Sequence, residues 1–297
     1  FLKVAAWTQP VWDSRLGRFL IEYLTLPWLK GLAPTARIPA KMILPRLAKR
    51  RLRERHADLV ESESPTAYFH GCAADYFDDG VGDAVIALLK KNGVEVALPP
   101  QRCSGTPIQT YGWIDRVRED AKFNIDSMER FERVITGCAS CTFMLKEYGS
   151  VFPEGEYHLK ARRLAEKVVH ISEFMADQRP GYDQSGNGKK KKRVTYHSSC
   201  HLRAAGVNDA PRRLLRQDPN LEFIEMPDAD RCAGGAGTFC IKNPRQSAAI
   251  FERKRRGIEA SGAQIVATSC PACMIQLKNG LKGTVDVKHI AQVLSEE

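Results

Sequence analysis

The sequence predicts an α/β protein of two tandem, similar βαβ-type domains with mostly parallel sheets, preceded by a helical N-terminal segment. One observation is a pattern of four cysteines that occurs twice, with gaps of 31, 35 and 3 residues and then of 32, 38 and 3 residues. Another is that short apolar strands alternate with helical stretches, as in βαβ units. The two sets are Cys72, Cys103, Cys138 and Cys141, and Cys200, Cys232, Cys270 and Cys273.

Each repeat contains the same succession of predicted elements. Apolar stretches predict strands at 66–70, 94–98 and 133–136 in the first repeat, and at 194–197, 221–226 and 264–268 in the second. Helical spacing of apolar residues predicts a helix over Val81, Ala84, Val85, Leu88 and Leu89. Further helices are expected at about 114–130 and 244–260, and matching stretches at 169–174 and 288–293 close the two repeats.

The cysteines follow the carboxyl ends of these predicted strands. In open parallel sheets, ligands bind beyond that edge. Thiols that lie 66 to 70 residues apart in sequence are therefore expected to converge on one point in each repeat. This expected convergence indicates a site more strongly than the two C-x-x-C pairs do alone.

Composition and charge divide the chain into four predicted parts. Of its 297 residues, 43% are hydrophobic and 27% charged, as in ordinary globular proteins. The net charge is +10, and residues 1–55 carry +9 of it, which predicts a docking segment rather than a nucleic-acid-binding face. The parts are a basic helical linker or docking segment (1–62), a first cysteine-rich domain (63–182), a flexible linker (183–192) and a second cysteine-rich domain (193–297).

The N-terminal segment leaves two interpretations open. Residues 19–30 predict a short amphipathic helix broken at Pro27, either packed on the body as a linker or docked on a membrane surface or partner. No run of 18 or more apolar residues is present, so no bilayer-spanning segment is predicted. Because the chain begins at Phe1 rather than at Met, we expect further sequence upstream.

The cysteine content predicts metal chemistry in a reducing, cytoplasmic compartment. The chain has nine cysteines, an odd number, with two C-x-x-C pairs and no secretory signal. Four thiolates suit an iron–sulfur cluster or a structural Zn²⁺. Glycine-rich flanks at 103–107 and 232–239 favour a cluster, because they let the backbone approach a bulky anion. Zinc at one site, or no metal, stays an open alternative.

The chain resembles the cysteine-rich (CCG) domain family over about residues 65–297. This family includes heterodisulfide reductase B-type subunits, iron–sulfur subunits of lactate and glycolate oxidases, and the C subunit of anaerobic glycerol-3-phosphate dehydrogenase, to which the resemblance is strongest. It rests on residues 68–72, 138–148, 196–201 and 236–239, with Lys242.

The resemblance implies an electron-transfer subunit with up to two clusters, of the 4Fe-4S type, on the eight cysteines. Electrons would pass from a flavoprotein dehydrogenase, acting on glycerol-3-phosphate or a 2-hydroxy acid, toward membrane quinone. The resemblance also implies a ferredoxin-like domain, upstream or in a partner, and peripheral attachment to the inner face of the cytoplasmic membrane.

One departure from the family pattern changes the expected chemistry. The Cys-Cys-Gly triplet reads Cys103-Ser104-Gly105 in the first repeat and Cys232-Ala233-Gly234 in the second, so each set lacks a fifth cysteine. This favours ordinary four-thiolate sites over a disulfide-reducing centre. Ser104 is expected to be a turn residue, with a weak oxygen ligand as the alternative. Cys240 is expected to be a structural thiol, with a replacement ligand as the alternative.

No catalytic acid, base or nucleophile can be assigned from the sequence. Histidines at the strand ends are expected to form structural hydrogen bonds, with tuning of a cluster as the alternative. They are His70, His170, His197, His201 and His289. Two rival functions stay open beside electron transfer: a thiol or heterodisulfide reductase subunit, and a zinc-bound or metal-free docking scaffold.

Overall fold

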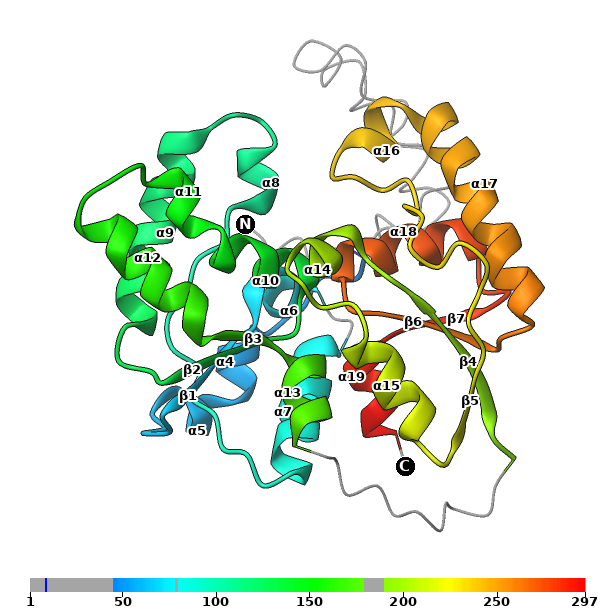
Figure 1. Cartoon of the computed structure of the whole chain (residues 1–297), viewed down its shortest axis with the longest axis horizontal. Coiled ribbons are helices and arrows are strands. Elements are labelled where there is room, and N and C mark those ends of the chain that lie inside the picture. The colour runs from blue at the N-terminus through cyan, green and yellow to red at the C-terminus, as the bar shows by residue number, and fades with distance from the viewer. Residues whose placement is uncertain (1–8, 10–44, 78–79, 179–189, 297) are drawn as a thin grey trace.

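The chain folds into two parallel sheets with helices packed on their faces (Figure 1). This computed structural model describes residue 9 and residues 45–77, 80–178 and 190–296. The strand order is β1 (Thr66–Phe69), β2 (Arg133–Thr136), β3 (Val168–His170) in the first sheet. In the second it is β5 (Leu221–Phe223), β4 (Lys192–His197), β6 (Ile265–Thr268), β7 (Asp286–His289). All pairings are parallel, so the predicted α/β class is confirmed.

The strand predicted at 94–98 is reduced to one parallel bridge between Ala97 and Ala67. The N–H of Tyr68 donates to the Ala97 carbonyl at 2.9 Å, beside the start of β1. Pro99 and Pro100 follow and have no N–H to donate, so the ladder stops there. With this bridge counted, β1 lies between the 94–98 segment and β2. In the second repeat β4 likewise lies between β5 and β6. That is the switch point beside which open α/β sheets bind ligands.

Helices connect the strands of both repeats in the same order. The predicted helices at 114–130 and 244–260 are present as α9 (Ile114–Met128) and α17 (Pro244–Ser261). The first repeat also contains α6 (Gly71–Tyr76), α7 (Val81–Lys91), α8 (Thr106–Gln109), α10 (Ala139–Lys146), α11 (Tyr148–Val151), α12 (Glu156–Lys167) and α13 (Ile171–Asp177). The second contains α14 (Cys200–Ala204), α15 (Ala210–Gln217), α16 (Phe239–Lys242), α18 (Pro271–Leu281) and α19 (Ile290–Ser295).

The two repeats share a hydrophobic core. Four helices lie between the sheets, with α7 packed on α19 and α13 packed on α15 (Figure 1). Helix α15 of the second repeat corresponds to α7 of the first, and α19 corresponds to α13. Because each helix packs on the other repeat's non-corresponding helix, the contact is approximately two-fold symmetric. One buried cluster accordingly draws Leu89 and Phe174 from the first repeat and Leu214 and Leu294 from the second.

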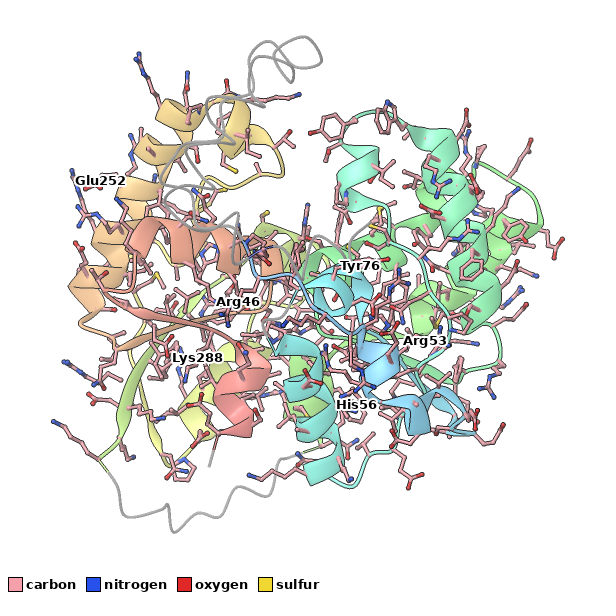
Figure 2. All side chains as sticks on the ribbon, turned by 180° about the vertical axis from the view of Figure 1, so that it is seen from behind. Arg46, Arg53, His56, Tyr76, Glu252 and Lys288 are labelled. Atoms are coloured by element: carbon pink, nitrogen blue, oxygen red, sulfur yellow. The ribbon has the colours of Figure 1, made fainter. Side chains whose placement is uncertain are left out.

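The N-terminal part that is described packs on the first repeat. Helices α4 (Leu52–Arg55) and α5 (Ala57–Val60) precede β1, and Leu52 is fully buried. Arg55 and His56 both contact the carboxylate of Asp83, at 2.8 and 2.7 Å, on the side where Figure 2 labels His56. The helix predicted at 19–30 and most of the linker predicted at 183–192 lie outside the described residues. Within the described part, no helix is both long and apolar enough to cross a bilayer.

Candidate functional site

The first cysteine set gathers at the carboxyl edge of the first sheet. Cys72 lies in the first turn of α6 just after β1, and Cys138 is the N-cap of α10 just after β2. The Sγ atoms of Cys72 and Cys103 are 3.8 Å apart, and Cys141 lies near both Cys138 and Cys72. Cys72 is exposed whereas Cys138 and Cys141 are buried, so the site is open to solvent on one side.

The thiols of this set influence one another's ionisation. The Cys72 thiol donates to Cys103 and lowers the pKa of Cys103 to about 6, and the Gly105 N–H, 3.5 Å from the same sulfur, acts in the same direction. The contact with Cys138 and burial both raise the pKa of Cys141. Because burial opposes charge, several thiolates at one point require a compensating cation. The set is therefore suited to a metal centre and poorly suited to four free thiolates.

Glycine allows a close approach at this site. Gly71 has φ +70°, and a Cβ atom placed there would lie 2.7 Å from the Sγ atom of Cys141. A side chain is excluded on both grounds, since real Cβ contacts are not that short and positive φ strains L residues. The backbone after β1 thus passes directly against a cysteine sulfur.

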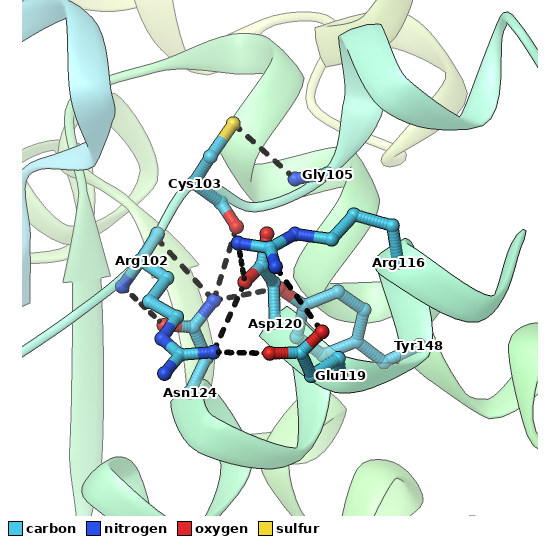
Figure 3. A network of polar contacts seen from close by, with 8 residues as sticks. All are labelled: Arg102, Cys103, Gly105, Arg116, Glu119, Asp120, Asn124 and Tyr148. Atoms are coloured by element: carbon cyan, nitrogen blue, oxygen red, sulfur yellow. Dashed lines mark hydrogen bonds and ion pairs between the residues drawn. The ribbon is translucent and has the colours of Figure 1, made fainter. Parts of the chain in front are cut away.

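A buried network of polar contacts holds Cys103 in place (Figure 3). The Asn124 side chain in α9 accepts from the Arg102 N–H at 2.8 Å and donates to the Cys103 carbonyl at 3.3 Å. Tyr148 contacts Asn124 at 3.0 Å and donates its hydroxyl proton to the Ser104 carbonyl at 3.0 Å. Asn124 is fully buried, so each of these contacts satisfies a polar group that water does not reach.

Paired charges surround that network. The Asp120 carboxylate is buried and lies 3.3 Å from Arg102 and 3.2 Å from Arg116 (Figure 3). Glu119, which is exposed, lies 3.2 Å from Arg102. The buried carboxylate of Asp120 is therefore compensated by two guanidinium groups.

The second cysteine set gathers in the equivalent place. Cys200 begins α14 after β4, and Cys270 is the N-cap of α18 after β6. Contact with Cys273 lowers the pKa of Cys270. The same contact and burial raise the pKa of Cys273, and the nearby Cys200 and Cys232 raise it further through space. The structure thus places the predicted cysteines of each set at the carboxyl edge of one sheet, without closing them around a single point.

The turn that follows Cys232 is held as tightly as its counterpart. The Gly234 N–H lies 3.2 Å from the Cys232 sulfur, and Ser247 donates to the Gly234 carbonyl at 2.8 Å. Gln276 of α18 donates to the Ala233 carbonyl at 3.1 Å. Gly234 has φ +86°, and a Cβ atom there would meet the Ser247 carbonyl oxygen at 2.7 Å. Backbone N–H groups are consequently directed at the cysteine, as an anionic site requires.

A buried lysine is the second repeat's counterpart of Asn124. Lys254 of α17 is 1% exposed, and its ammonium donates to the carbonyls of Asp228 and Ala229 at 2.6 and 3.1 Å. Burial lowers the pKa of Lys254 to about 8, while Cys232 and Cys273 act on it through space in the opposite direction. The ammonium therefore remains largely protonated at neutral pH within reach of the second set.

The two sites touch each other. The Ala139 N–H, at the start of α10, donates to the Ser269 carbonyl at 2.9 Å. Ser140 Oγ lies 3.8 Å from the Cys270 sulfur and 2.8 Å from Nδ1 of His201. The C-x-x-C turns of both repeats are thus adjacent, which the shared core between the sheets makes possible.

Two of the histidines act as helix caps. Nδ1 of His170 accepts from the Ser172 N–H and Nδ1 of His289 from the Ala291 N–H, both at 3.2 Å. Burial lowers the pKa of His289 to about 4 and that of His170 well below its usual value. Their role as helix caps accounts for the presence of these two histidines. The matching stretches at 169–174 and 288–293 are therefore the ends of β3 and β7 and the starts of the helices that follow them.

The substitute ligands considered for the missing fifth cysteines have different surroundings. Cys240 contacts the Gly237 carbonyl at 3.5 Å, and its pKa is raised by burial, with no other cysteine acting on it. Ser104 is buried, lies 3.4 Å from Thr106 and acts by hydrogen bonding on Cys141. Ser104 is therefore nearer to its cysteine set than Cys240 is to the second set.

The donors present fit a metal centre. In the described ranges, no three His, Cys, Asp or Glu side chains are grouped closely enough to be ligands of one ion. The thiols of each set are neighbours without forming a closed tetrahedron, all nine cysteines are free of disulfides, and backbone N–H groups point at Cys103 and Cys232. Soft thiolate donors with N–H groups beside them are the environment that iron–sulfur clusters and zinc use in proteins.

Sequence reasoning missed the residues that support the cysteines from the long helices. Asn124 and Lys254 lie 21 and 22 residues after the middle cysteine of their sets, and Gln276 follows the second C-x-x-C pair. A polar residue on the apolar face of a predicted helix indicates a buried polar contact. The sequence does not show which group that residue binds.

This fold, with two cysteine sites at the carboxyl edges of two like sheets, defines a tandem cysteine-rich domain protein. The pattern of the cysteine-rich (CCG) domain matches residues 66–146 and 194–278, and the chain belongs to that family.

Relatives of the chain carry a common name. The chain is 34% identical over 233 residues to lactate utilization protein A of Geobacillus sp., covering 76% of this chain and 97% of that protein. It is 33% identical over 236 residues to lactate utilization protein A 1 of Bacillus mycoides, covering 77% and 96%. A glutamate racemase from Francisella tularensis overlaps 78% of each chain at a TM-score of 0.34 and 12% identity, too slight a likeness to support an inference.

Proposed function

We propose that this chain is an iron–sulfur electron-transfer subunit of an oxidoreductase complex that oxidises lactate or a related 2-hydroxy acid. The observation that carries the proposal is that both four-cysteine sets lie at the carboxyl edges of their sheets, in adjacent sites joined by the Ala139–Ser269 hydrogen bond of 2.9 Å. Relatives named lactate utilization protein A, which this chain matches over nearly their whole length, support the substrate class.

Each cysteine set would hold one cluster. The proposed ligands are Cys72, Cys103, Cys138 and Cys141 in the first site, and Cys200, Cys232, Cys270 and Cys273 in the second. A bound cluster would supply one-electron chemistry, while this chain's own groups would supply thiolates, N–H donors and a partly buried surrounding. No side chain is assigned to substrate chemistry, which would take place on a flavoprotein partner.

The parts of the chain would divide this work. We assign the two cluster domains to residues 63–182 and 193–297, joined by a linker at 183–192. The basic segment 1–62 would dock on a partner or on an anionic membrane surface, from which electrons would reach quinone. A glycerol-3-phosphate dehydrogenase partner is the less favoured assignment, because the relatives' name points to lactate.

Two rival functions make different demands on the site. A heterodisulfide reductase would need the fifth cysteine that Ser104 and Ala233 replace. A zinc-bound scaffold would need only one of the sets to close around an ion, and a metal-free scaffold would need neither. The doubled donor sets and the N–H groups at Cys103 and Cys232 favour clusters.

Iron and sulfide analysis with EPR on anaerobically purified protein tests the proposal. We expect iron, sulfide and two reducible signals, and Cys72→Ser and Cys200→Ser should each remove one signal. Cys240→Ser is the matched control and should keep both. A colourless protein containing zinc, or reduction of a mixed disulfide at turnover rates, would contradict the proposal.

A further inference from the structure

The two cysteine sites differ in the buried charges beside them. Asn124 and Lys254 occupy equivalent places in α9 and α17, and each donates to backbone carbonyls of the segment that leads into the middle cysteine. Asn124 is neutral, whereas Lys254 carries an ammonium group that is 1% exposed. This exchange of a neutral amide for an ammonium is an electrostatic difference between the two sets.

Among the described residues, no carboxylate forms an ion pair with the ammonium of Lys254. Its hydrogen-bond acceptors are the uncharged carbonyl oxygens of Asp228 and Ala229. The carboxylates of Asp228 and Asp230 act on it only through space, and each is paired with an arginine, Asp228 with Arg231 at 2.8 Å and Asp230 with Arg203 at 3.6 Å. Within the described residues the second set therefore lies beside a buried cation that forms no ion pair with a carboxylate.

Among the residues that the structure describes, no buried cation lies beside the first set. Asp120, the buried carboxylate that acts on Cys103, is a negative charge, and Arg102 and Arg116 bind it at 3.3 and 3.2 Å. These guanidinium groups are 40% and 53% exposed, so water screens them more than it screens Lys254. The fixed charges thus favour added negative charge more strongly at the second set.

The position of Lys254 is enforced by close packing. A Cβ atom on Gly257, one turn further along α17, would lie 2.5 Å from the Pro227 carbonyl oxygen. The Ala229 carbonyl also accepts from the Ser198 N–H at 3.0 Å, two residues before Cys200. The ammonium is therefore held against a turn that touches the approaches to both Cys200 and Cys232.

We propose that Lys254 makes the second cysteine set the stronger electron acceptor, so that electrons pass from the first set to the second. This inference rests on the proposed electron-transfer function. Each one-electron step oxidises the centre at the first set and reduces the centre at the second, with reduced flavin as donor and quinone as acceptor. The physical cause is that a buried cation stabilises the more negative, reduced state of a neighbouring centre.

Redox titration followed by EPR tests this direction on the cluster-loaded protein. Cys232→Ser, which removes the second signal, identifies which midpoint belongs to which site. In the unmodified protein the second site should have the higher midpoint potential. Lys254→Gln, which keeps donors for both carbonyls but removes the charge, should shift the equilibrium between the sites at least tenfold toward the first, about 59 mV for one electron.

Lys254→Arg is the matched control, since it keeps the charge and should retain most of the difference between the two midpoints. A lower midpoint at the second site in the unmodified protein would overturn the inference. So would an unchanged midpoint in Lys254→Gln, or an equal shift in the Gln and Arg variants, which would indicate packing rather than charge. Absence of both clusters from the unmodified protein would instead refute the proposed function, and this inference with it.

Discussion

The backbone N–H of Ala139 donates to the carbonyl of Ser269 at 2.9 Å, and this bond joins the two C-x-x-C turns. Each of these residues is next to a cysteine, Cys138 in one repeat and Cys270 in the other. A change that moves one turn is therefore transmitted directly to the other site. The relationship is the structural reason to treat the two sites as one relay.

Ala139→Pro tests that bond. Pro271 occupies the equivalent first helical position in the second repeat, so α10 should tolerate the ring. The substitution removes the N–H and leaves the Ser269 carbonyl, in a fully buried residue, without its donor, at a cost of about 1–3 kcal/mol. Urea unfolding should show a lower midpoint, and iron should be lost faster from both sites. An unchanged midpoint together with unchanged iron retention would contradict this coupling.

Gly71→Ala should damage the first site more than its backbone strain alone explains. Gly71 and Gly93 both have φ +70°, but a Cβ atom on Gly71 would lie 2.7 Å from the Cys141 sulfur, whereas one on Gly93 would meet nothing within 4 Å. Gly93→Ala is therefore the matched control and should cost about 1–2 kcal/mol. Gly71→Ala should cost more in urea unfolding and reduce the iron content of the first site. Equal effects of the two variants would show that the close contact is unimportant.

Asn124→Ala should destabilise the first repeat through its buried partners. It removes the acceptor of the Arg102 N–H and the donor to the Cys103 carbonyl and to the buried Tyr148 hydroxyl, from a side chain that is itself fully buried. We expect a loss of about 2–4 kcal/mol in unfolding free energy, because each abandoned buried group costs about 1–3 kcal/mol. Asn92→Ala removes a partly buried contact with the Leu88 carbonyl and should cost less than about 1 kcal/mol. Similar losses in both would contradict the role given to Asn124.

Stability should fall as the pH is lowered from about 6.5 toward 4. Burial lowers the pKa of His289 to about 4 and that of His197 to about 3, so in this range the unfolded chain binds protons that the folded chain does not. Each such histidine contributes a slope of up to about 1.4 kcal/mol per pH unit, and its contribution is fully present above pH 6.5.

His289→Asn isolates one of these slopes. Asparagine can still accept from the Ala291 N–H as a helix cap but does not titrate. Urea midpoints measured across the pH range should therefore depend less on pH in the variant than in the unmodified protein. Parallel profiles would show that His289 does not take up a proton on unfolding.

Local patterns in the sequence were enough to predict the strand–helix order, the two cysteine sets and their place at strand ends. These follow from local periodicity and spacing, and they predicted strands such as β2 and helices such as α9 to within about two residues. The strand at 94–98 was overestimated because the apolar pattern is silent about pairing, which Pro99 and Pro100 cut short.

Contacts between segments that are distant in the sequence could be seen only in the folded chain. Folding placed Ala139 against Ser269, packed α7 on α19 and α13 on α15, and buried Asn124 and Lys254 beneath equivalent turns. In the sequence, Asn124 and Lys254 are both simply polar residues within a predicted helix. Their difference in charge affects the cysteine sets only because packing excludes water and leaves the charge of Lys254 beside the second set.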